Sequence, residues 1–251
     1  MEPVLSVCEI EKTFFDADAA CPALRGVSFA IAPREIVCLM GPSGCGKSTI
    51  LRIIAGLEES DSGSIRPAAD NNGGTARTAM VFQDPALFPW LSVYDNIVYG
   101  LRLAAQRVPE EEVKRRAAAL LALTHLGDFS RSLPHQLSGG MKQRAAVARA
   151  LVVEPPVILM DEPFSALDPF TRRELEDEIL RIRTKLETTF LIVTHNPEEA
   201  VYLADRIIVL SPRPGKVAAQ IPVSLPFPRD PADPAFLSIR EKVTRAVLGV
   251  E

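Results

Sequence analysis

The stretch from Ile36 to Leu57 constrains the fold of this chain more than any other, because it joins three patterns in one order. An uninterrupted apolar run from Ile36 to Met40 predicts a buried strand. A glycine loop follows, and after it comes a segment whose apolar residues recur at helical spacing. The loop matches G-x-x-x-x-G-K-[ST], and a strand before it with a helix after it is the context in which that pattern binds phosphate.

Each part of this loop suits an anionic ligand. Gly41 and Gly46 allow tight turns and leave backbone N–H groups free to point at phosphate oxygens. The N-terminus of the following helix adds a positive potential. Lys47 supplies a positive charge for the β- and γ-phosphates, and Ser48 supplies a hydroxyl for Mg²⁺. We therefore expect a nucleotide to bind here, and we interpret Cys45 inside the loop as a small residue that fits.

Composition excludes several classes of protein. The 251 residues are 47% hydrophobic and 24% charged, which fits one large globular domain or a domain with an inserted subdomain. With a net charge of -4, the chain lacks the basic character of a nucleic-acid-binding protein. No signal segment follows Met1, and no apolar run approaches the roughly 18 residues that a membrane span needs. We expect a soluble, cytoplasmic chain that reaches a membrane only through a partner.

Two short strands are predicted before the phosphate loop. Val4 to Ile10 and the alternating segment Gly26 to Ile31 both have strand patterns. Their position ahead of a buried strand indicates an antiparallel β layer beside a parallel core. Phe14 and Phe15 lie between them, and an exposed ring there could stack on adenine, which contributes about 1–3 kcal/mol. From spacing alone, core packing is the interpretation that we prefer for both rings.

Downstream of the first helix, strand and loop patterns give way to helical ones. The polar run 69–76 predicts a loop, and residues 79–82 predict a buried strand followed by Gln83. A glutamine at the end of a strand can reach a metal ion or a water, although alone it is usually just a strand end. Two helical patterns then indicate a helical subdomain inserted into the α/β core, at Val93 to Leu103 and at Glu110 to Leu126.

A second helix start has the features of an anion site. Ser138 is a natural N-cap, and Gly139 and Gly140 let another molecule approach the backbone closely. The N-terminus of a helix attracts anions, whereas a plain serine-capped helix is the alternative. Because this helix start is far from the phosphate loop in the sequence, the two together suggest a composite site.

Polar residues follow two further predicted core strands. Residues 157–160 predict a buried strand that leads into Asp161 and Glu162. Residues 190–193 predict another, with His195 two positions later. The carboxyl ends of parallel strands are where ligands bind in α/β folds. Asp161 can hold Mg²⁺ through water, Glu162 can polarise an attacking water, and His195 can contact a γ-phosphate, although an isolated histidine is usually structural.

Taken together, these motifs and their order resemble the nucleotide-binding subunits of ATP-binding cassette (ABC) transporters over nearly the whole chain. The most specific motif is L-S-G-G-M at 137–141, which other P-loop folds lack. The resemblance implies an α/β fold: a P-loop NTPase core with a mainly parallel sheet, an N-terminal antiparallel β layer and an inserted helical subdomain. It implies one nucleotide-binding domain, 1–251, with the core and β layer at 1–83 and 156–223, the helical subdomain at about 84–155, and a C-terminal tail and helix at 224–251.

The resemblance also implies ATP and Mg²⁺ as cofactors and a role for each motif residue. Glu162 is the implied general base, and His195 contacts the γ-phosphate and the attacking water. The resemblance implies that Phe14 stacks on the adenine, and this interpretation replaces that of Phe14 as a core residue. The implied catalytic residues are Lys47, Gln83, Glu162 and His195. The implied Mg²⁺ ligands are Ser48, Gln83 and Asp161. The implied nucleotide-binding residues are Phe14, Gly41, Pro42, Ser43, Gly44, Cys45, Gly46, Lys47, Ser48, Thr49, Ser138, Gly139 and Gly140.

The implied partners follow from the same resemblance. Two ATPase subunits pair head-to-tail with two ATP between them, so that Ser138 and Gly140 of one subunit cap the nucleotide of the other, and we expect a homodimer. An integral membrane permease is the second partner, and a solute-binding protein takes part indirectly. No nucleic acid is expected. The implied location is the cytoplasmic face of the inner (cell) membrane, where the chain is peripheral.

Three segments narrow the resemblance to a subgroup. Residues 88–97, 194–215 and 225–230 are similar to those of nitrate, sulfonate and taurine import ATPases. They imply an ATP-hydrolysing subunit that powers an importer for a small anionic solute. The alternatives are the ABC ATPase of an exporter or a lipid-trafficking system, and a soluble ABC ATPase that is not coupled to transport.

Overall fold

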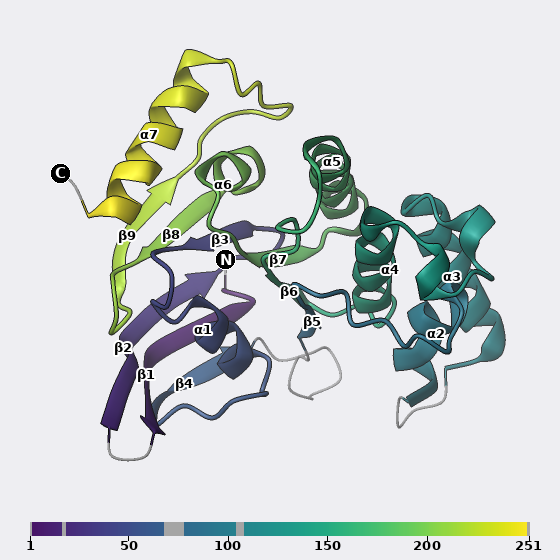
Figure 1. The fold of residues 1–251 in the computed structure, drawn as a ribbon, viewed down its shortest axis with the longest axis horizontal. Coiled ribbons are helices and arrows are strands. Elements are labelled where there is room, and N and C mark those ends of the chain that lie inside the picture. The colour runs from purple at the N-terminus through teal and green to yellow at the C-terminus, as the bar shows by residue number, and fades with distance from the viewer. Residues whose placement is uncertain (1, 17–18, 68–77, 104–107, 250–251) are drawn as a thin grey trace.

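The computed structural model describes residues 2–16, 19–67, 78–103 and 108–249, so the loop expected at 69–76 lies outside the described residues. The centre of the fold is a six-stranded sheet in the order β5-β6-β7-β3-β8-β9 (Figure 1). β9 runs antiparallel to β8, and the other neighbouring strands are parallel. The strands are β3 (Ile36–Met40), β5 (Ala79–Val81), β6 (Val157–Asp161), β7 (Thr189–Val193), β8 (Arg206–Leu210) and β9 (Val217–Pro222).

A second sheet of three antiparallel strands, in the order β2-β1-β4, lies beside the central sheet (Figure 1). It confirms the antiparallel β layer expected near the N-terminus. β1 and β2 are longer than the sequence patterns predict, because register shifts after Val7, Ile10 and Lys12 break the alternation on which such patterns depend. The strands are β1 (Leu5–Asp16), β2 (Ala19–Ile31) and β4 (Ser62–Pro67).

Helices cover the central sheet and also gather at one end of the molecule. α2, α3 and α4 lie together at that end, away from α1 and α7 (Figure 1). Among the described residues, no helix combines the length and the apolar content that a membrane span requires. The helices are α1 (Lys47–Ile54), α2 (Val93–Leu103), α3 (Glu110–Leu123), α4 (Gly139–Leu151), α5 (Pro169–Leu186), α6 (Pro197–Leu203) and α7 (Pro234–Leu248), with 3₁₀ turns at Gly127–Phe129 and Pro134–Gln136.

The predicted helices agree with the structure except at two C-terminal ends. The helix after the phosphate loop, whose apolar spacing runs to Leu57, ends at Ile54. α2 has the predicted bounds, whereas α3 ends at Leu123 and not at Leu126. His125 adopts a left-handed backbone with a φ of 54°, which a continuing helix does not allow. The sequence patterns did not predict α5 or α6, although each begins with a capping residue followed by proline, at Asp168 and Asn196.

β3 separates two hydrophobic cores, which explains its uninterrupted apolar run. The side chains of Ile36, Cys38 and Met40 are buried among the helices on one face of the sheet. Val37 and Leu39 are buried on the other face, together with α1 and the antiparallel sheet. A strand that is covered on both faces needs apolar residues at every position. Packing on both faces fixes β3, and β3 in turn fixes the position of Gly41, the residue that follows it.

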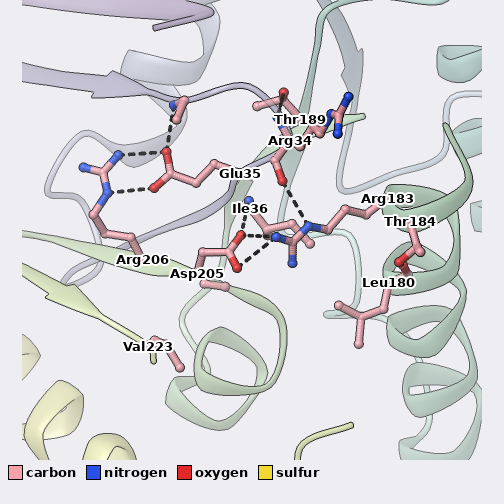
Figure 2. Close-up of polar contacts among 12 residues, drawn as sticks. Arg34, Glu35, Ile36, Leu180, Arg183, Thr184, Thr189, Asp205, Arg206 and Val223 are labelled. Atoms are coloured by element: carbon pink, nitrogen blue, oxygen red, sulfur yellow. Dashed lines mark hydrogen bonds and ion pairs between the residues drawn. The ribbon is translucent and has the colours of Figure 1, made fainter. Parts of the chain in front are cut away.

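An ion-pair network ties the amino ends of β3 and β8 to α5 (Figure 2). The Asp205 carboxylate accepts a hydrogen bond from the Ile36 backbone N–H at 2.9 Å and pairs with Arg183 at 2.8 Å. Glu35 accepts hydrogen bonds from Arg206 Nε at 2.8 Å and Nη2 at 3.1 Å. The Asp205 backbone N–H also donates to the Ile36 carbonyl at 2.8 Å. The network thus fixes the point at which β3 enters the sheet.

We predict that Asp205→Ala lowers the free energy of unfolding by about 2 kcal/mol, because it leaves the Ile36 N–H and the Arg183 guanidinium without this partner. Glu187→Ala is the control, since its pair with Arg34 is exposed and contributes less than about 1 kcal/mol. Urea unfolding of both variants and the wild type measures the difference. Equal losses in the two variants would contradict the role given to Asp205.

Arg144 of α4 links α5 to the group of helices formed by α2, α3 and α4. Its Nη2 lies 2.7 Å from Glu174, and its Nε lies 3.1 Å from Glu178. The Glu178 side chain is buried, and this burial raises the pKa of its carboxyl to about 7, although Arg144 acts in the opposite direction. A carboxylate whose charge is costly to bury therefore lies where α4 meets α5.

We predict that the Glu178 carboxyl makes stability fall as pH rises. Its pKa is about 7 in the folded chain against an ordinary 4.5, so between these values the unfolded chain releases a proton that the folded chain keeps. The free energy of unfolding therefore falls across this window, by at most about 3 kcal/mol. Urea unfolding between about pH 5 and 7.5 measures this slope. Glu178→Gln should remove the Glu178 share of it and keep the share of Glu176, whose pKa burial also raises to about 7. Parallel pH profiles for wild type and variant would show the prediction to be wrong.

Candidate functional site

Three neighbouring strands end at one edge of the central sheet, and the expected site residues follow them. β6, β7 and β3 are adjacent and parallel, so their carboxyl ends lie together. β3 leads into the phosphate loop, β6 ends at Asp161 with Glu162 next, and β7 is followed by Thr194 and His195. The fold therefore gathers segments that are far apart in the sequence.

The phosphate loop between β3 and α1 depends on glycine at two positions. Gly46 precedes α1 with a φ of 100°, and a Cβ there would lie 2.5 Å from Leu24 Cδ2. A Cβ on Gly41 would lie 2.8 Å from both Cys45 Sγ and the Leu210 carbonyl oxygen. A side chain at either position would push the loop away from the strands around it. The loop stays tight and leads directly into the positive N-terminus of α1.

Lys47 is buried at the start of α1 and keeps its charge available. Its Nζ donates to the carbonyl oxygens of Gly41 at 2.9 Å and Pro42 at 3.0 Å. With Cys45 Sγ at 3.9 Å, these are its hydrogen-bond partners among the described residues. Within the described part of the chain, no carboxylate forms an ion pair with this ammonium, so the carbonyl dipoles that hold it leave its charge able to attract an anion.

Cys45 contributes to the loop through its backbone. Its side chain is fully buried, and burial raises the pKa of the thiol, although the Lys47 charge lowers it. Its backbone N–H donates to the Pro42 carbonyl at 3.3 Å. Because the thiolate is the reactive form of cysteine, a buried thiol with a raised pKa reacts slowly. The geometry agrees with the interpretation of Cys45 as a small residue that fits the loop.

Ser48 and Asp161 form the part of the site that suits a metal ion. The Ser48 hydroxyl donates to Asp161 Oδ1 at 3.0 Å. Burial raises the pKa of Asp161, and the hydrogen bond from Ser48 acts in the opposite direction. A hydroxyl and a carboxylate are the hard oxygen donors that Mg²⁺ prefers, with waters completing its shell. The donor set therefore fits Mg²⁺.

Gln83 lies close to β5, but it is hydrogen-bonded to a different part of the site. Its Nε2 donates to the Ser165 hydroxyl at 3.2 Å, and that hydroxyl donates to the Glu162 carbonyl oxygen at 2.9 Å. The structure connects Gln83 to the segment after Glu162, so its role as a Mg²⁺ ligand stays a prediction. Ser165 was not among the predicted site residues, because its contact with Gln83 joins two segments that only the fold brings together.

Glu162 and His195 face each other across the sheet edge. Glu162 Oε2 lies 3.1 Å from His195 Nδ1. The Glu162 backbone is left-handed, with a φ of 46°, and its N–H donates to the Val193 carbonyl at 3.0 Å. The His195 side chain is 64% exposed, so its ring can meet a ligand while Nδ1 contacts the carboxylate. This pair can accept a proton from a bound water.

The second predicted anion site lies at the N-terminus of α4. Ser138 caps this helix by accepting a hydrogen bond from the Met141 N–H at 3.3 Å, which confirms the predicted N-cap. A Cβ on Gly140 would lie 2.2 Å from Thr171 Cγ2, so the helix start packs closely against α5. Ser138 and Gly139 are exposed, and α4 lies well apart from α1 (Figure 1). Within one chain, the two helix starts do not form one site.

Phe14 and Phe15 lie near the end of β1, and the core packing that their spacing favours is wrong. Phe14 is 38% exposed and Phe15 is 81% exposed. The hairpin end of β1 and β2 extends beyond the central sheet (Figure 1). Phe14 and Phe15 belong to the last residues of β1, at that end. Lys12 Nζ lies 5.2 Å from the Phe14 ring centroid, and Cys21 of β2 pairs with Phe14. The ring of Phe14 is accessible, and its stacking on adenine stays a prediction.

Known sequences resemble this chain over most of its length. The sequence profile of the ABC transporter family matches residues 24–165. The aliphatic sulfonates import ATP-binding protein SsuB of Bacillus subtilis is 42% identical over 236 residues, which cover 93% of this chain and 90% of that protein. The aliphatic sulfonates import ATP-binding protein SsuB 1 of Pseudomonas syringae is 43% identical over 225 residues, which cover 89% of each.

Solved structures share the fold. A dimeric ATP-binding cassette in a post-hydrolysis state, bound to ADP and Pi, has a TM-score of 0.76 and 30% identity, and the match covers 88% of this chain and 99% of that one. CbiO1 from Clostridium perfringens, part of the ABC transporter complex CbiONQ, has a TM-score of 0.75 and 29% identity, and covers 88% of each chain. The predicted fold class is confirmed, and the chain belongs to the ABC transporter family.

Proposed function

We propose that this chain is the ATP-hydrolysing subunit of an ABC importer for a small anionic solute of the sulfonate type. ABC ATP-binding proteins hydrolyse ATP, and the phosphate loop, two carboxylates and a histidine of this chain share one sheet edge. The observation that carries the importer assignment is the similarity to sulfonate-import ATP-binding proteins over about nine-tenths of both chains.

ATP would bind at the phosphate loop. Backbone N–H groups of residues 41–49 and the Lys47 ammonium would contact its phosphates. Ser48 and Asp161, which already contact each other at 3.0 Å, would hold Mg²⁺, with Gln83 as a further ligand. When bound, Mg²⁺ supplies positive charge that neutralises oxygens of the β- and γ-phosphates.

Glu162 acts as the general base in this proposal. Its carboxylate accepts a proton from the water that attacks the γ-phosphate. His195, 3.1 Å away, orients that carboxylate and presents the exposed part of its ring to the γ-phosphate. Lys47 stabilises the charge that develops on the phosphate oxygens, and such stabilisation supplies most of the catalysis in phosphoryl transfer.

A second copy of the chain completes the site. Ser138, Gly139 and Gly140 begin α4, which lies well apart from the phosphate loop of the same chain (Figure 1). In a head-to-tail homodimer, this helix start would cap the nucleotide that the other copy holds, because a helix N-terminus attracts anionic oxygens. Phe14 would stack on the adenine at the far end of that nucleotide.

An integral membrane permease is the partner that couples hydrolysis to transport. It would dock on the helical subdomain, residues 84–155, close to Gln83. Phe82, next to Gln83, and Trp90, within the helical subdomain, are both exposed, and aromatic side chains are enriched at protein interfaces. The chain would be peripheral at the cytoplasmic face of the cell membrane, with a solute-binding protein involved only indirectly. The core and β layer, 1–83 and 156–223, and the tail, 224–251, would make up the rest of the domain.

We predict that Glu162→Gln lowers the turnover number for ATP at least about 100-fold with little change in ATP affinity, because the amide keeps the size of the side chain but cannot accept the proton. Phosphate release and ATP binding by the full chain measure the two quantities. The unhydrolysed nucleotide should also hold the dimer together, which size-exclusion chromatography with ATP detects. Glu198→Gln, on an exposed position of α6, is the control. Near-wild-type hydrolysis by Glu162→Gln would falsify the base assignment.

The transport proposal predicts two results in the native cells. Tagged Glu162→Gln protein, purified with ATP from gently solubilised membranes, should carry an integral membrane permease with it. Cells that lack the chain should fail to grow on an alkanesulfonate as the only sulfur source and should grow normally on sulfate, because uptake stops without ATP hydrolysis. Soluble or nucleic-acid partners alone would overturn the transport assignment and leave the ATPase chemistry intact. Normal growth on the sulfonate would overturn the solute class.

A further inference from the structure

One buried carboxylate holds the segment that carries His195. Glu199 of α6 is 6% exposed. Its Oε2 accepts a hydrogen bond from Thr194 Oγ1 at 2.5 Å, and its Oε1 accepts one from Asn196 Nδ2 at 3.3 Å. The residues on both sides of His195 are therefore bonded to the same side chain.

Further bonds close this segment, residues 194–196, into a tight turn. Thr194 Oγ1 accepts a hydrogen bond from the Asn196 backbone N–H at 3.0 Å. The Thr194 backbone N–H donates to the Leu39 carbonyl at 3.3 Å, which ties the turn to β3. The His195 ring is exposed, whereas its two neighbours are bonded on the inner side. Rotation of the backbone at His195 would therefore have to break several of these bonds.

Glu199 also reaches the loop 165–168, through Arg172. Arg172 Nη1 lies 3.5 Å from Glu199 Oε1, and its Nη2 donates to the Leu167 carbonyl at 3.1 Å. That loop follows Glu162, the residue that faces His195. The two loops on either side of the Glu162–His195 contact therefore share one ion pair.

Glu199 is distinguished from the other carboxylates beside it. A pocket of about 130 Å³ lies next to this ion pair, and Glu176, Glu198 and Glu199 line it together with Arg173. Glu176 pairs with Arg173 at 3.1 Å, and Glu198 points to Arg240 at 3.7 Å. Among the described carboxylates that line the pocket, Glu199 is the one whose side chain is bonded to the turn at 194–196.

We propose that Glu199 is a positioning residue for ATP hydrolysis. It holds the turn so that His195 keeps its contact with Glu162, and Arg172 ties the same turn to the loop 165–168. This inference rests on the proposed function, because it takes His195 to act in hydrolysis. Glu199 itself lies behind the turn and acts through the placement of the His195 ring.

A double-mutant cycle on the full chain tests the proposal, with turnover number and KM for ATP as the readouts. We expect Glu199→Ala to lower turnover at least about tenfold and to change KM less than about threefold, because the groups that bind the phosphates are retained. In a His195→Ala background, the same change should alter turnover less than about twofold, since no ring is left to position. A purely structural role would lower turnover by the same factor in both backgrounds.

Two further variants control for folding and for local charge. Thr194→Val removes the hydroxyl that Glu199 accepts from and keeps nearly the same shape, so it should repeat the pattern of Glu199→Ala in a folded protein. Glu198→Ala removes the neighbouring exposed carboxylate and should leave turnover unchanged. The stoichiometry of ATP binding gives the active fraction of each preparation, so that turnover is expressed per active site.

The outcomes separate this inference from the proposed function. The positioning role is wrong if Glu199→Ala and Thr194→Val hydrolyse ATP at the wild-type rate, or if their losses are equal with and without His195. If His195→Ala alone hydrolyses ATP at the wild-type rate, the role of His195 in the proposed function fails, and the inference is overturned with it. A loss that depends on the presence of His195 supports both.

Discussion

The burial of β3 between two hydrophobic cores is the constraint on which the rest of the structure depends. Ile36, Cys38 and Met40 pack against the helices, and Val37 and Leu39 pack against the antiparallel sheet and α1. Because both faces are covered, β3 can neither slide nor twist without exposing apolar surface on one side. The phosphate loop starts from this fixed strand, and the parallel neighbours β7 and β6 bring their own carboxyl ends to the same edge.

Charges at this edge are balanced only in part within the chain. The Lys47 ammonium is held by two carbonyl oxygens, which do not neutralise its charge, so it can still bind an anion. Asp161 and Glu162 are adjacent acids, and burial together with the Glu162 charge raises the pKa of Asp161. The site therefore favours a ligand that brings anionic oxygens to Lys47 and a divalent cation to Asp161. A nucleoside triphosphate with Mg²⁺ supplies both, whereas either component alone satisfies one half of the site.

Sequence patterns predicted the elements in which every residue has the same kind of surroundings, such as a strand that is buried on both faces. Uninterrupted apolar runs located β3, β6 and β7 to within one residue, and the local chemistry of glycine and serine located the phosphate loop and the Ser138 cap. The same reasoning was wrong for Phe14 and Phe15, because register shifts in β1 and the projecting hairpin end are properties of strand pairing. The contact between Gln83 and Ser165 joins segments that only the sheet order brings together, so no local pattern could predict it.

α5 connects α4, which begins next to Ser138, with the sheet edge that carries Glu162 and His195. Arg144, one and a half turns into α4, pairs with Glu174 and Glu178 of α5. The first turn of α5 carries Arg172, which bonds the loop after Glu162 and reaches Glu199. A displacement of α4 that preserves the Arg144 pairs would tend to move α5, which carries the Arg172 contacts to the two loops beside the Glu162–His195 contact. In the proposed head-to-tail dimer, α5 would connect the helix start at Ser138 with the Glu162–His195 contact, through the Arg144 pairs at α4 and the Arg172 contacts at the two loops. Hydrolysis in that proposal would then depend on the closed state of the dimer.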